Sequence, residues 1–310
     1  MSNPEGKSQK LTVEVPANPD IIKKYHKTSY PAISPHRPEL NQAGKTILVT
    51  GASAGIGFAI ARGFGEASAS RVILTGRRSD VLQTAASKLA HEFRETEFLV
   101  RVCDVGSASQ TADLWAGLRR DNIFVDVLIL NAADLRVLGS LMDSGADKIW
   151  PQYETNFRSL LDFTERLYKQ EGYEDKQKYV VFITTGVVHL KAPIQAFPAY
   201  SLAKINGQIL MQRLAGEVDR KKLQVFNMHP GMILSETLLN GGMDEDTLAW
   251  DDAPATLPGH FAVWAATSEA AFLHGRFAWA AWDVDELKSG EFRERVDSDP
   301  DFLTIGIKGL

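Results

Sequence analysis

Short apolar runs alternate with longer helical segments along most of this chain, and this alternation limits the fold more than any other feature. From Lys45 onward, seven such runs are expected to be strands. They are Thr46–Thr50, Arg71–Thr75, Glu97–Val102, Val125–Asn131, Tyr179–Thr184, Leu223–Met228 and Arg276–Trp282. Strands that are apolar along nearly their whole length are typical of a parallel sheet covered on both faces.

The segments between these runs repeat their apolar residues at helical spacing. They are Ile56–Phe64, Val81–Phe93, Gln110–Leu118, Tyr153–Lys169 and Tyr200–Val218. Strands that alternate with helices indicate βαβ units. The sequence therefore predicts an α/β fold with a doubly wound (Rossmann) parallel sheet of about seven strands.

A chain of 310 residues can form one large α/β domain or two small domains. No internal repeat or linker divides it, so we expect a single domain over residues 44–290. Residues 1–43 are proline-rich and lack periodicity, which predicts an N-terminal extension or arm. Residues 291–310 are expected to form a C-terminal tail.

Composition argues against several classes of function. The net charge is −5 and basic residues are scattered, so we expect no nucleic-acid partner. No window reaches the roughly 18 to 20 apolar residues of a membrane span, and we expect no membrane association. Cys103 is the single cysteine, which excludes an intrachain disulfide and fits a reducing compartment. No Cys/His cluster has metal-ligand spacing. These features favour a cytoplasmic protein without a metal.

The first predicted strand runs into a glycine-rich turn, Thr50-Gly51-Ala52-Ser53-Ala54-Gly55-Ile56-Gly57, and a helix follows. Glycines permit a tight backbone path and close approach to a pyrophosphate, and the helix N-terminus offers free N–H groups to it. The spacing G-x-x-x-G-x-G differs from the general dinucleotide fingerprint. It resembles the glycine motif of the short-chain dehydrogenase/reductase family, which implies cofactor contacts at Gly51, Ser53, Gly55, Ile56 and Gly57.

The end of the second strand bears on the choice of cofactor, because it meets the adenosine ribose about 20 residues after the glycines in such folds. Here Arg77 and Arg78 follow the strand, and no acid stands at the turn. Two guanidinium groups suit a phosphate dianion. We expect NADP(H) rather than NAD(H).

Further matches to the family lie at the ends of later strands. Asp104 matches the acid that hydrogen-bonds adenine, and Asn131 matches the residue that braces the sheet beside the cofactor. After the sixth strand, the resemblance implies that Pro230, Gly231, Ile233 and Ser235 contact the nicotinamide side. Apolar residues between 233 and 257 resemble the family's substrate lid and favour a hydrophobic substrate.

Tyr200 and Lys204 form a Tyr-x-x-x-Lys pair after the fifth strand. Residues four apart share one helical face. A free tyrosine has a pKa of about 10, and a neighbouring ammonium group is expected to lower it toward the working pH. The pair is therefore expected to supply a general acid/base, and Lys204 to bind the cofactor ribose, as in the family.

Two more catalytic positions follow from the resemblance. The family's serine after the fifth strand is replaced here by Thr185, with Thr184 and His189 as nearby alternatives. Asn156 matches the asparagine of the helix between the fourth and fifth strands. Its side chain is expected to hold the water that links Lys204 to solvent.

The resemblance implies an NADP(H)-dependent oxidoreductase that reduces a carbonyl, or oxidises the alcohol, of a small molecule. It also implies a homodimer or homotetramer through the helices around Asn156 and Tyr200. Two alternatives remain at this stage. One is an imine reductase, epimerase or cyclase of secondary metabolism on the same scaffold, and the other is an NADP-binding regulator without turnover.

Overall fold

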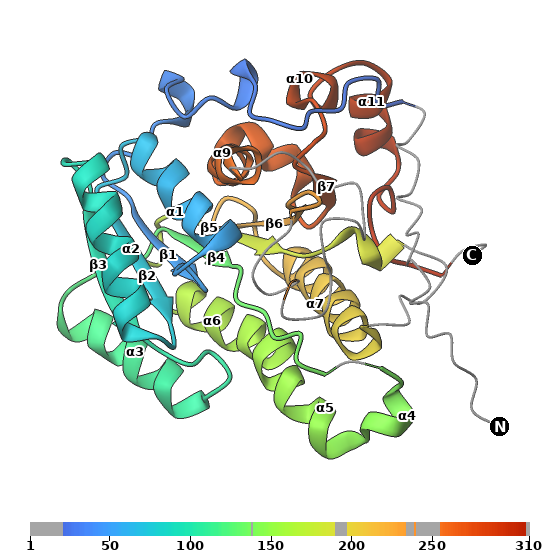
Figure 1. The fold of residues 1–310 in the computed structure, drawn as a ribbon. Helices are drawn as coiled ribbons and strands as arrows, with labels where there is room; N and C mark the ends of the chain where they lie inside the picture. Colours follow the sequence, from blue (N-terminus) through green and yellow to red (C-terminus); the bar gives the residue numbers. More distant parts are fainter. Residues whose placement is uncertain (1–20, 138, 190–196, 234–238, 240–254, 308–310) are drawn as a thin grey trace, which may run out of the picture.

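The structure is a computed structural model of the 310-residue chain and describes residues 21–137, 139–189, 197–233, 239 and 255–307 (Figure 1). Its centre is a sheet of seven strands in the order β3-β2-β1-β4-β5-β6-β7, and every neighbouring pair is parallel. The strands are β1 Thr46–Thr50, β2 Arg71–Gly76, β3 Glu97–Val102, β4 Val127–Leu130, β5 Lys178–Ile183, β6 Leu223–His229 and β7 Phe277–Trp279. The predicted doubly wound α/β fold is confirmed.

Helices cover both faces of the sheet, each with its own apolar core (Figure 1). One face carries α1 Gly55–Glu66, α2 Ser79–Glu92 and α9 Thr256–Ala265. The other carries α3 Ala108–Arg120, α6 Ser159–Tyr168 and α7 Pro198–Glu217. β1, β4, β5 and β6 are buried along their whole length, as expected of strands covered on both sides.

Shorter elements lie in the connections and at the C-terminal end. They are η1 Pro31–Ile33, η2 Pro38–Leu40, α4 Leu141–Ser144, α5 Ala146–Tyr153, η3 Glu154–Arg158, η4 Gly186–His189, η5 Ser268–Leu273, α10 Val284–Leu287 and α11 Gly290–Ser298. Phe292 and Val296 of α11 are buried, so this helix packs on the domain.

The helix predicted over Tyr153–Lys169 is interrupted in the structure. α5 and α6 are joined by η3, one turn of wider π-helix that contains Asn156. Such turns add a residue to the helix and loosen its hydrogen-bond ladder. Sequence periodicity did not reveal this turn, because its apolar pattern continues from one helix into the next.

Two predicted strands are shorter than expected, because neighbouring groups replace the sheet ladder at their ends. Val125 exchanges hydrogen bonds with the side chain of Gln170, so β4 begins only at Val127. β7 ends at Trp279, and Trp282 instead forms an antiparallel bridge with Tyr25.

Residues 21–43, hereafter the N-terminal strap, lie against β7, α9 and α10 (Figure 1). Ile22, Tyr30, Ile33 and Leu40 are buried in the same core as α1 and α9. The strap is also held by polar contacts, including a 2.8 Å ion pair between His26 and Asp283. The first twenty residues of the predicted arm lie outside the described part of the chain.

Candidate active site

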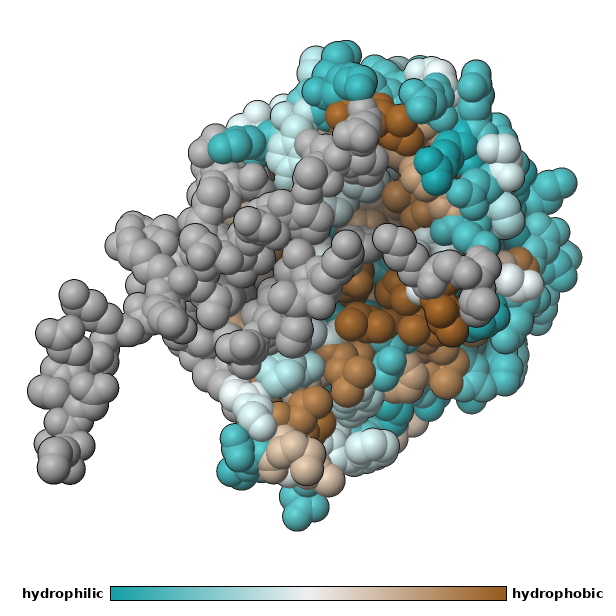
Figure 2. Space-filling view, turned by 90° about the vertical axis from the view of Figure 1, so that its right-hand side faces the viewer, coloured by the Kyte–Doolittle hydropathy of each residue, from teal (hydrophilic) through white to brown (hydrophobic). Residues whose placement is uncertain are grey.

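The carboxyl ends of the parallel strands carry most of the predicted site residues. β1 and β4 are neighbours at the centre of the sheet, and the chain continues from them toward opposite edges. Ligands of open α/β sheets bind in the crevice at such a switch point. In Figure 1 the β5 arrow ends toward the right, and Figure 2 looks onto that side of the molecule. Hydrophobic residues gather in the central part of this face (Figure 2).

The glycine-rich turn leaves β1 and enters α1 as predicted. Gly51 and Gly55 have φ angles of +66° and +56°, a region that side chains disfavour. Gly57 is required for packing, because a Cβ atom there would lie 2.2 Å from the carbonyl oxygen of Gly51. The turn therefore folds onto itself only with glycine at these positions.

The amino end of α1 fits an anionic group. Its N-cap residue, Ala54, makes no side-chain capping bond, since alanine has no acceptor. The first N–H groups of a helix have no partner within the helix, and its dipole is positive at that end. Ser53 is half-buried beside them and Gly55 is exposed. These donors suit the pyrophosphate of a dinucleotide.

Asn131 braces β4 against β1, as the sequence predicts. Its Nδ2 atom donates to the carbonyl oxygens of Thr50 at 2.9 Å and of Gly51 at 3.2 Å. The hydroxyl of Thr50 in turn accepts from the backbone N–H groups of Asn131 and Ala132. This network fixes the glycine turn relative to the end of β4.

The residues predicted to meet adenosine lie at the same edge. Arg77 and Arg78 directly follow β2 and are exposed. Asp104 is half-buried after β3, and its carboxylate accepts from the backbone N–H of Gly106 at 2.9 Å. Guanidinium groups exposed at this position can bind an anionic ligand from solvent.

Asp134, three residues after Asn131, was not identified from the sequence. Burial acts to raise the pKa of its carboxyl, but hydrogen bonds from Arg136 and the nearby charge of Arg77 hold that pKa below its usual range. The pattern Asp134-x-Arg136 is a weak signal, because acid–base pairs of this spacing are common on surfaces. The Asp134 carboxylate therefore carries its negative charge near Arg77 at this edge, and Arg136 neutralises it.

Asn156 is buried, and its side chain clamps the backbone of Asp134. Its Oδ1 accepts from the Asp134 N–H, and its Nδ2 donates to the Asp134 carbonyl, both at 2.7 Å. Gln152, which the sequence did not single out, donates to the same carbonyl at 2.5 Å. Both polar atoms of the Asn156 side chain thus have a backbone partner, and each can form one more hydrogen bond, so the expected water site stays a prediction.

The loop after β5 contains Thr185 and both of its alternatives. Thr185 is half-buried, whereas the Thr184 side chain is buried together with its hydroxyl oxygen. His189 is the last residue of η4. The backbone N–H of Gly186 donates to Nδ1 of His229, a 3.1 Å contact that ties this loop to the end of β6.

Tyr200 and Lys204 both lie in α7, one turn apart. Lys204 is buried, its Nζ atom donates to the Ile183 carbonyl at 2.6 Å, and it lies 5.7 Å from the centre of the Tyr200 ring. Burial lowers the pKa of Lys204 to about 7 and raises the pKa of Tyr200. The expected lowering of the Tyr200 pKa is therefore wrong for this structure: desolvation of the phenol outweighs a lysine that is only partly charged at neutral pH.

The predicted nicotinamide-side residues are only partly described. Pro230 and Gly231 follow β6 and are buried, and Gly231 has a φ of +105°. Ile233 is half-buried. Ser235 and most of the predicted lid over residues 233–257 lie outside the described residues.

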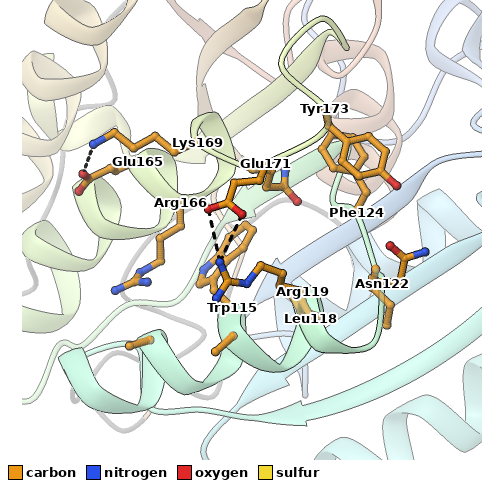
Figure 3. Close-up of a pocket in the computed structure, with 14 residues that line it drawn as sticks. Trp115, Leu118, Arg119, Asn122, Phe124, Glu165, Arg166, Lys169, Glu171 and Tyr173 are labelled. Atoms are coloured by element: carbon orange, nitrogen blue, oxygen red, sulfur yellow. Dashed lines mark hydrogen bonds and ion pairs between the residues drawn. The ribbon is translucent and has the colours of Figure 1, made fainter.

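A separate cavity of about 410 Å³ lies between α3 and α6 (Figure 3). It is lined by segments that lead into β4 and β5, including Phe124 and Tyr173, so it lies at the amino-terminal edge of the sheet. Arg119 faces Glu171, and Lys169 pairs with Glu165 at its rim. None of the predicted site residues lines this cavity.

Comparison with known proteins identifies the family. A model of the short chain dehydrogenase family matches residues 45–246. A short chain dehydrogenase/reductase of Claviceps purpurea is 33% identical over 292 residues, 93% of this chain and 94% of the relative. AacuD, a short chain dehydrogenase/reductase of Aspergillus aculeatus, is 30% identical over 283 residues, 91% and 95% of the two chains. This chain therefore belongs to the short-chain dehydrogenase/reductase family of oxidoreductases.

Solved structures agree on the fold. The Pseudomonas aeruginosa RhlG/NADP active-site complex has a TM-score of 0.69 and 21% identity, over 83% of this chain and 99% of that chain. The NADPH-dependent 3-quinuclidinone reductase from Rhodotorula rubra has a TM-score of 0.69 and 18% identity, over 82% and 96%.

Within the described residues, no group of three or more His, Cys, Asp or Glu side chains is arranged to hold a metal ion. Nor is any helix in the described ranges long and apolar enough to cross a bilayer. Cys103 is buried, and burial raises the pKa of its thiol to about 12, which suits a core residue and not a nucleophile.

Proposed function

We propose that this protein is an NADP(H)-dependent reductase of a hydrophobic carbonyl compound. The observation that carries the proposal is the placement of Tyr200 and the buried Lys204 on one helix beside the end of β5. The uncapped amino end of α1 lies at the same edge of the sheet. A proton donor and an anion-binding helix end at one edge suit hydride transfer coupled to proton transfer.

In this mechanism the nicotinamide, when bound, supplies the hydride. The hydroxyls of Thr185 and Tyr200 orient the substrate carbonyl, and Tyr200 donates a proton to its oxygen. Tyr200 is protonated at neutral pH, as a proton donor must be, and burial raises its pKa. The buried hydroxyl of Thr184 faces away from solvent, which supports Thr185 as the contact to substrate.

Lys204 orients the ribose of the cofactor and takes part in the proton supply to Tyr200. Its lowered pKa allows it to exchange a proton near neutral pH. Asn156 is a positioning residue, since it holds the segment after β4 through the Asp134 backbone.

The preference for NADP(H) rests on Arg77 and Arg78. Both are exposed at the end of β2, and charge-assisted bonds to a 2′-phosphate would compensate for its charge. Ser53, Gly55 and Ile56 offer donors to the pyrophosphate, and Asp104 is the proposed partner of adenine. Pro230, Gly231, Ile233 and Ser235 are proposed to meet the nicotinamide side.

A hydrophobic substrate is favoured by the apolar central part of the face seen in Figure 2. A neighbour in fold from Rhodotorula rubra is a 3-quinuclidinone reductase, and 3-quinuclidinone is a ketone. A bulky ketone is therefore the first substrate class to examine.

We also propose a homodimer or homotetramer assembled through α5, α6 and α7. Trp150, Leu161 and Leu202 are 64%, 44% and 40% exposed on these adjacent helices. Apolar side chains of this size are usually covered by a partner when they occur together. Light scattering of the purified protein, with Leu161→Glu as the dissociating variant, tests this assembly.

The test of the function is NADPH consumption by the purified protein against a panel of ketones, aldehydes and imines. Tyr200→Phe is run beside the wild type, because it removes the hydroxyl and keeps the ring. We expect turnover of a ketone that falls by at least about a hundredfold in the variant. Turnover that survives the substitution would exclude Tyr200 as the proton donor, and NADPH binding without turnover of any compound would contradict the proposed reductase.

A further inference from the structure

His229 lies at the last position of β6, between the loop that follows β5 and the side chain of Trp279 on β7. It is 4% exposed. Its Nδ1 accepts a 3.1 Å hydrogen bond from the backbone N–H of Gly186, the residue after Thr185. Its ring meets the Trp279 ring edge to face, with 4.4 Å between ring centres. One side chain thus joins the ends of three neighbouring strands.

The hydrogen bond specifies the protonation state of the ring. An Nδ1 atom that accepts a proton cannot carry one, so the neutral ring holds its hydrogen on Nε2. Only an acceptor at the Nδ1 position can satisfy the Gly186 N–H in this geometry. The contact therefore depends on the position of one atom and not only on the bulk of the ring.

The loop rests closely on both rings. A Cβ atom at Gly186 would lie 3.1 Å from Cζ2 of Trp279 and 3.6 Å from Cδ2 of His229. A side chain at this position would push the loop away from the sheet. His229 and Trp279 therefore form a floor under Gly186, and the hydrogen bond holds the loop down on it.

The N-terminal strap also contacts this floor. Tyr25 contacts Trp279 edge to face at 6.3 Å, and Trp282, which bridges to Tyr25, stacks with Trp279 at 6.3 Å. The ring of Trp279 is thus packed against Tyr25 and Trp282 as well as His229. Rigid support of this kind is what precise placement of a catalytic hydroxyl requires.

We infer that His229 is a positioning residue, which sets the backbone of Thr185–Gly186 through the Gly186 N–H and thereby aims the Thr185 hydroxyl at the substrate. The inference rests on the proposed function for its effect on activity. The hydrogen bond itself is independent of any reaction, and the two parts are therefore tested by different measurements.

Two substitutions of similar polarity separate position from bulk. In His229→Asn the side-chain oxygen takes the place of Nδ1, whereas in His229→Gln it lies one bond farther out, near the place of Nε2. His229→Leu keeps the volume approximately and removes the acceptor. We expect His229→Asn to retain kcat within about threefold, and the other two to lose on the order of tenfold to a hundredfold, as for a misplaced catalytic group. The Kd for NADPH should stay unchanged.

Exchange of the Gly186 amide proton, followed by NMR on protein labelled with ¹⁵N-glycine, is the second measurement. We expect slow exchange in the wild type and His229→Asn, and faster exchange in His229→Gln and His229→Leu.

Equal exchange in the Asn and Gln variants would overturn the inference, even for a protein without reductase activity. So would equal kcat in those variants, or loss of the folded state in all three. Absence of turnover in the wild type, with the exchange pattern intact, would count against the proposed function alone.

Discussion

The Nζ atom of Lys204 donates a 2.6 Å hydrogen bond to the backbone carbonyl of Ile183, the last residue of β5. This bond ties the first turns of α7 to the carboxyl edge of the sheet, where Thr185 follows two residues later. It also gives the buried lysine a polar partner that carries no charge. A lysine so placed is held at the site but is not kept protonated by an anion.

Replacing Lys204 by Met should abolish turnover and change the pH dependence of stability. Burial lowers the pKa of Lys204 to about 7 from its ordinary 10.5. Below about pH 7 the folded and unfolded states are both protonated, so the full cost of burying the charge is present. Between pH 7 and pH 10.5 only the unfolded state holds the proton, so the free-energy cost of burying Lys204 diminishes as pH rises. Lys204→Met should therefore be more stable than the wild type at pH 6, by a few kcal/mol at about 1.4 kcal/mol per pKa unit, and the gain should shrink by pH 9.

Lys178 provides the matched control for this experiment. It is a second buried lysine whose Nζ donates to a backbone carbonyl, that of Tyr173, but it stands at the opposite end of β5. Lys178→Met should keep NADPH turnover. Urea unfolding between pH 6 and 9 measures the stability of all three proteins. A gain for Lys204→Met that does not vary with pH would contradict the lowered pKa.

Gly57→Ala should prevent the glycine turn from forming. The new Cβ atom would lie 2.2 Å from the Gly51 oxygen and 2.5 Å from Nδ2 of Asn131. The first of these atoms belongs to the backbone, and the second is held by its hydrogen bond to the Thr50 carbonyl. We expect a loss of about 1–3 kcal/mol in unfolding free energy and loss of NADPH binding, measured by urea unfolding and by fluorescence titration. Gly216→Ala, where nothing lies within 4 Å of the added atom, should be neutral or stabilise α7 by up to about 1 kcal/mol. Similar effects of the two substitutions would argue against the packing explanation.

Replacing Arg77 and Arg78 by Ala should weaken NADPH binding and leave NADH binding nearly unchanged. Each charge-assisted bond to the 2′-phosphate contributes about 1.5–3 kcal/mol, which corresponds to a loss of affinity of at least about tenfold. Calorimetric titration with both cofactors measures the ratio. Arg94→Ala, an exposed arginine in the turn that follows α2, is the control and should change neither affinity. An equal loss of affinity for NADPH and NADH would show that these arginines do not bind the 2′-phosphate.

Asp283→Asn should weaken the N-terminal strap in a pH-dependent way. Burial acts to raise the pKa of Asp283, but hydrogen bonds from His26 and from the Glu286 N–H hold that pKa below its ordinary value. A carboxyl with a lowered pKa stabilises the fold above its unfolded pKa, and this contribution is lost as pH falls through the folded value. Asparagine still caps α10 but carries no charge.

The variant should therefore be about 1 kcal/mol less stable than the wild type near pH 6, and the difference should disappear as pH falls through the lowered pKa of Asp283. Urea unfolding across this range measures it, with tryptophan fluorescence as the probe, since Trp282 bridges to the strap. A difference that persists at low pH would assign the effect to packing.

The parallel sheet, the alternation of its strands with helices and the glycine turn follow from the sequence, because they depend on local patterns. Continuous apolar runs such as Thr46–Thr50 specify buried strands, and the glycines at 51, 55 and 57 specify the one turn that joins β1 to α1. The helical spacing of Tyr200 and Lys204 likewise places both residues on one helix before any tertiary contact is known.

Tertiary structure decided the features that depend on contacts between distant residues. Asn156 binds the Asp134 backbone, and His229 binds the Gly186 N–H, and neither pairing leaves a periodic signal in the sequence. The pKa of Tyr200 is raised and not lowered, because it depends on how deeply the folded chain buries the phenol. The N-terminal strap has no regular pattern of its own, and its place was set only by the surfaces of β7, α9 and α10 against which it buries its apolar side chains.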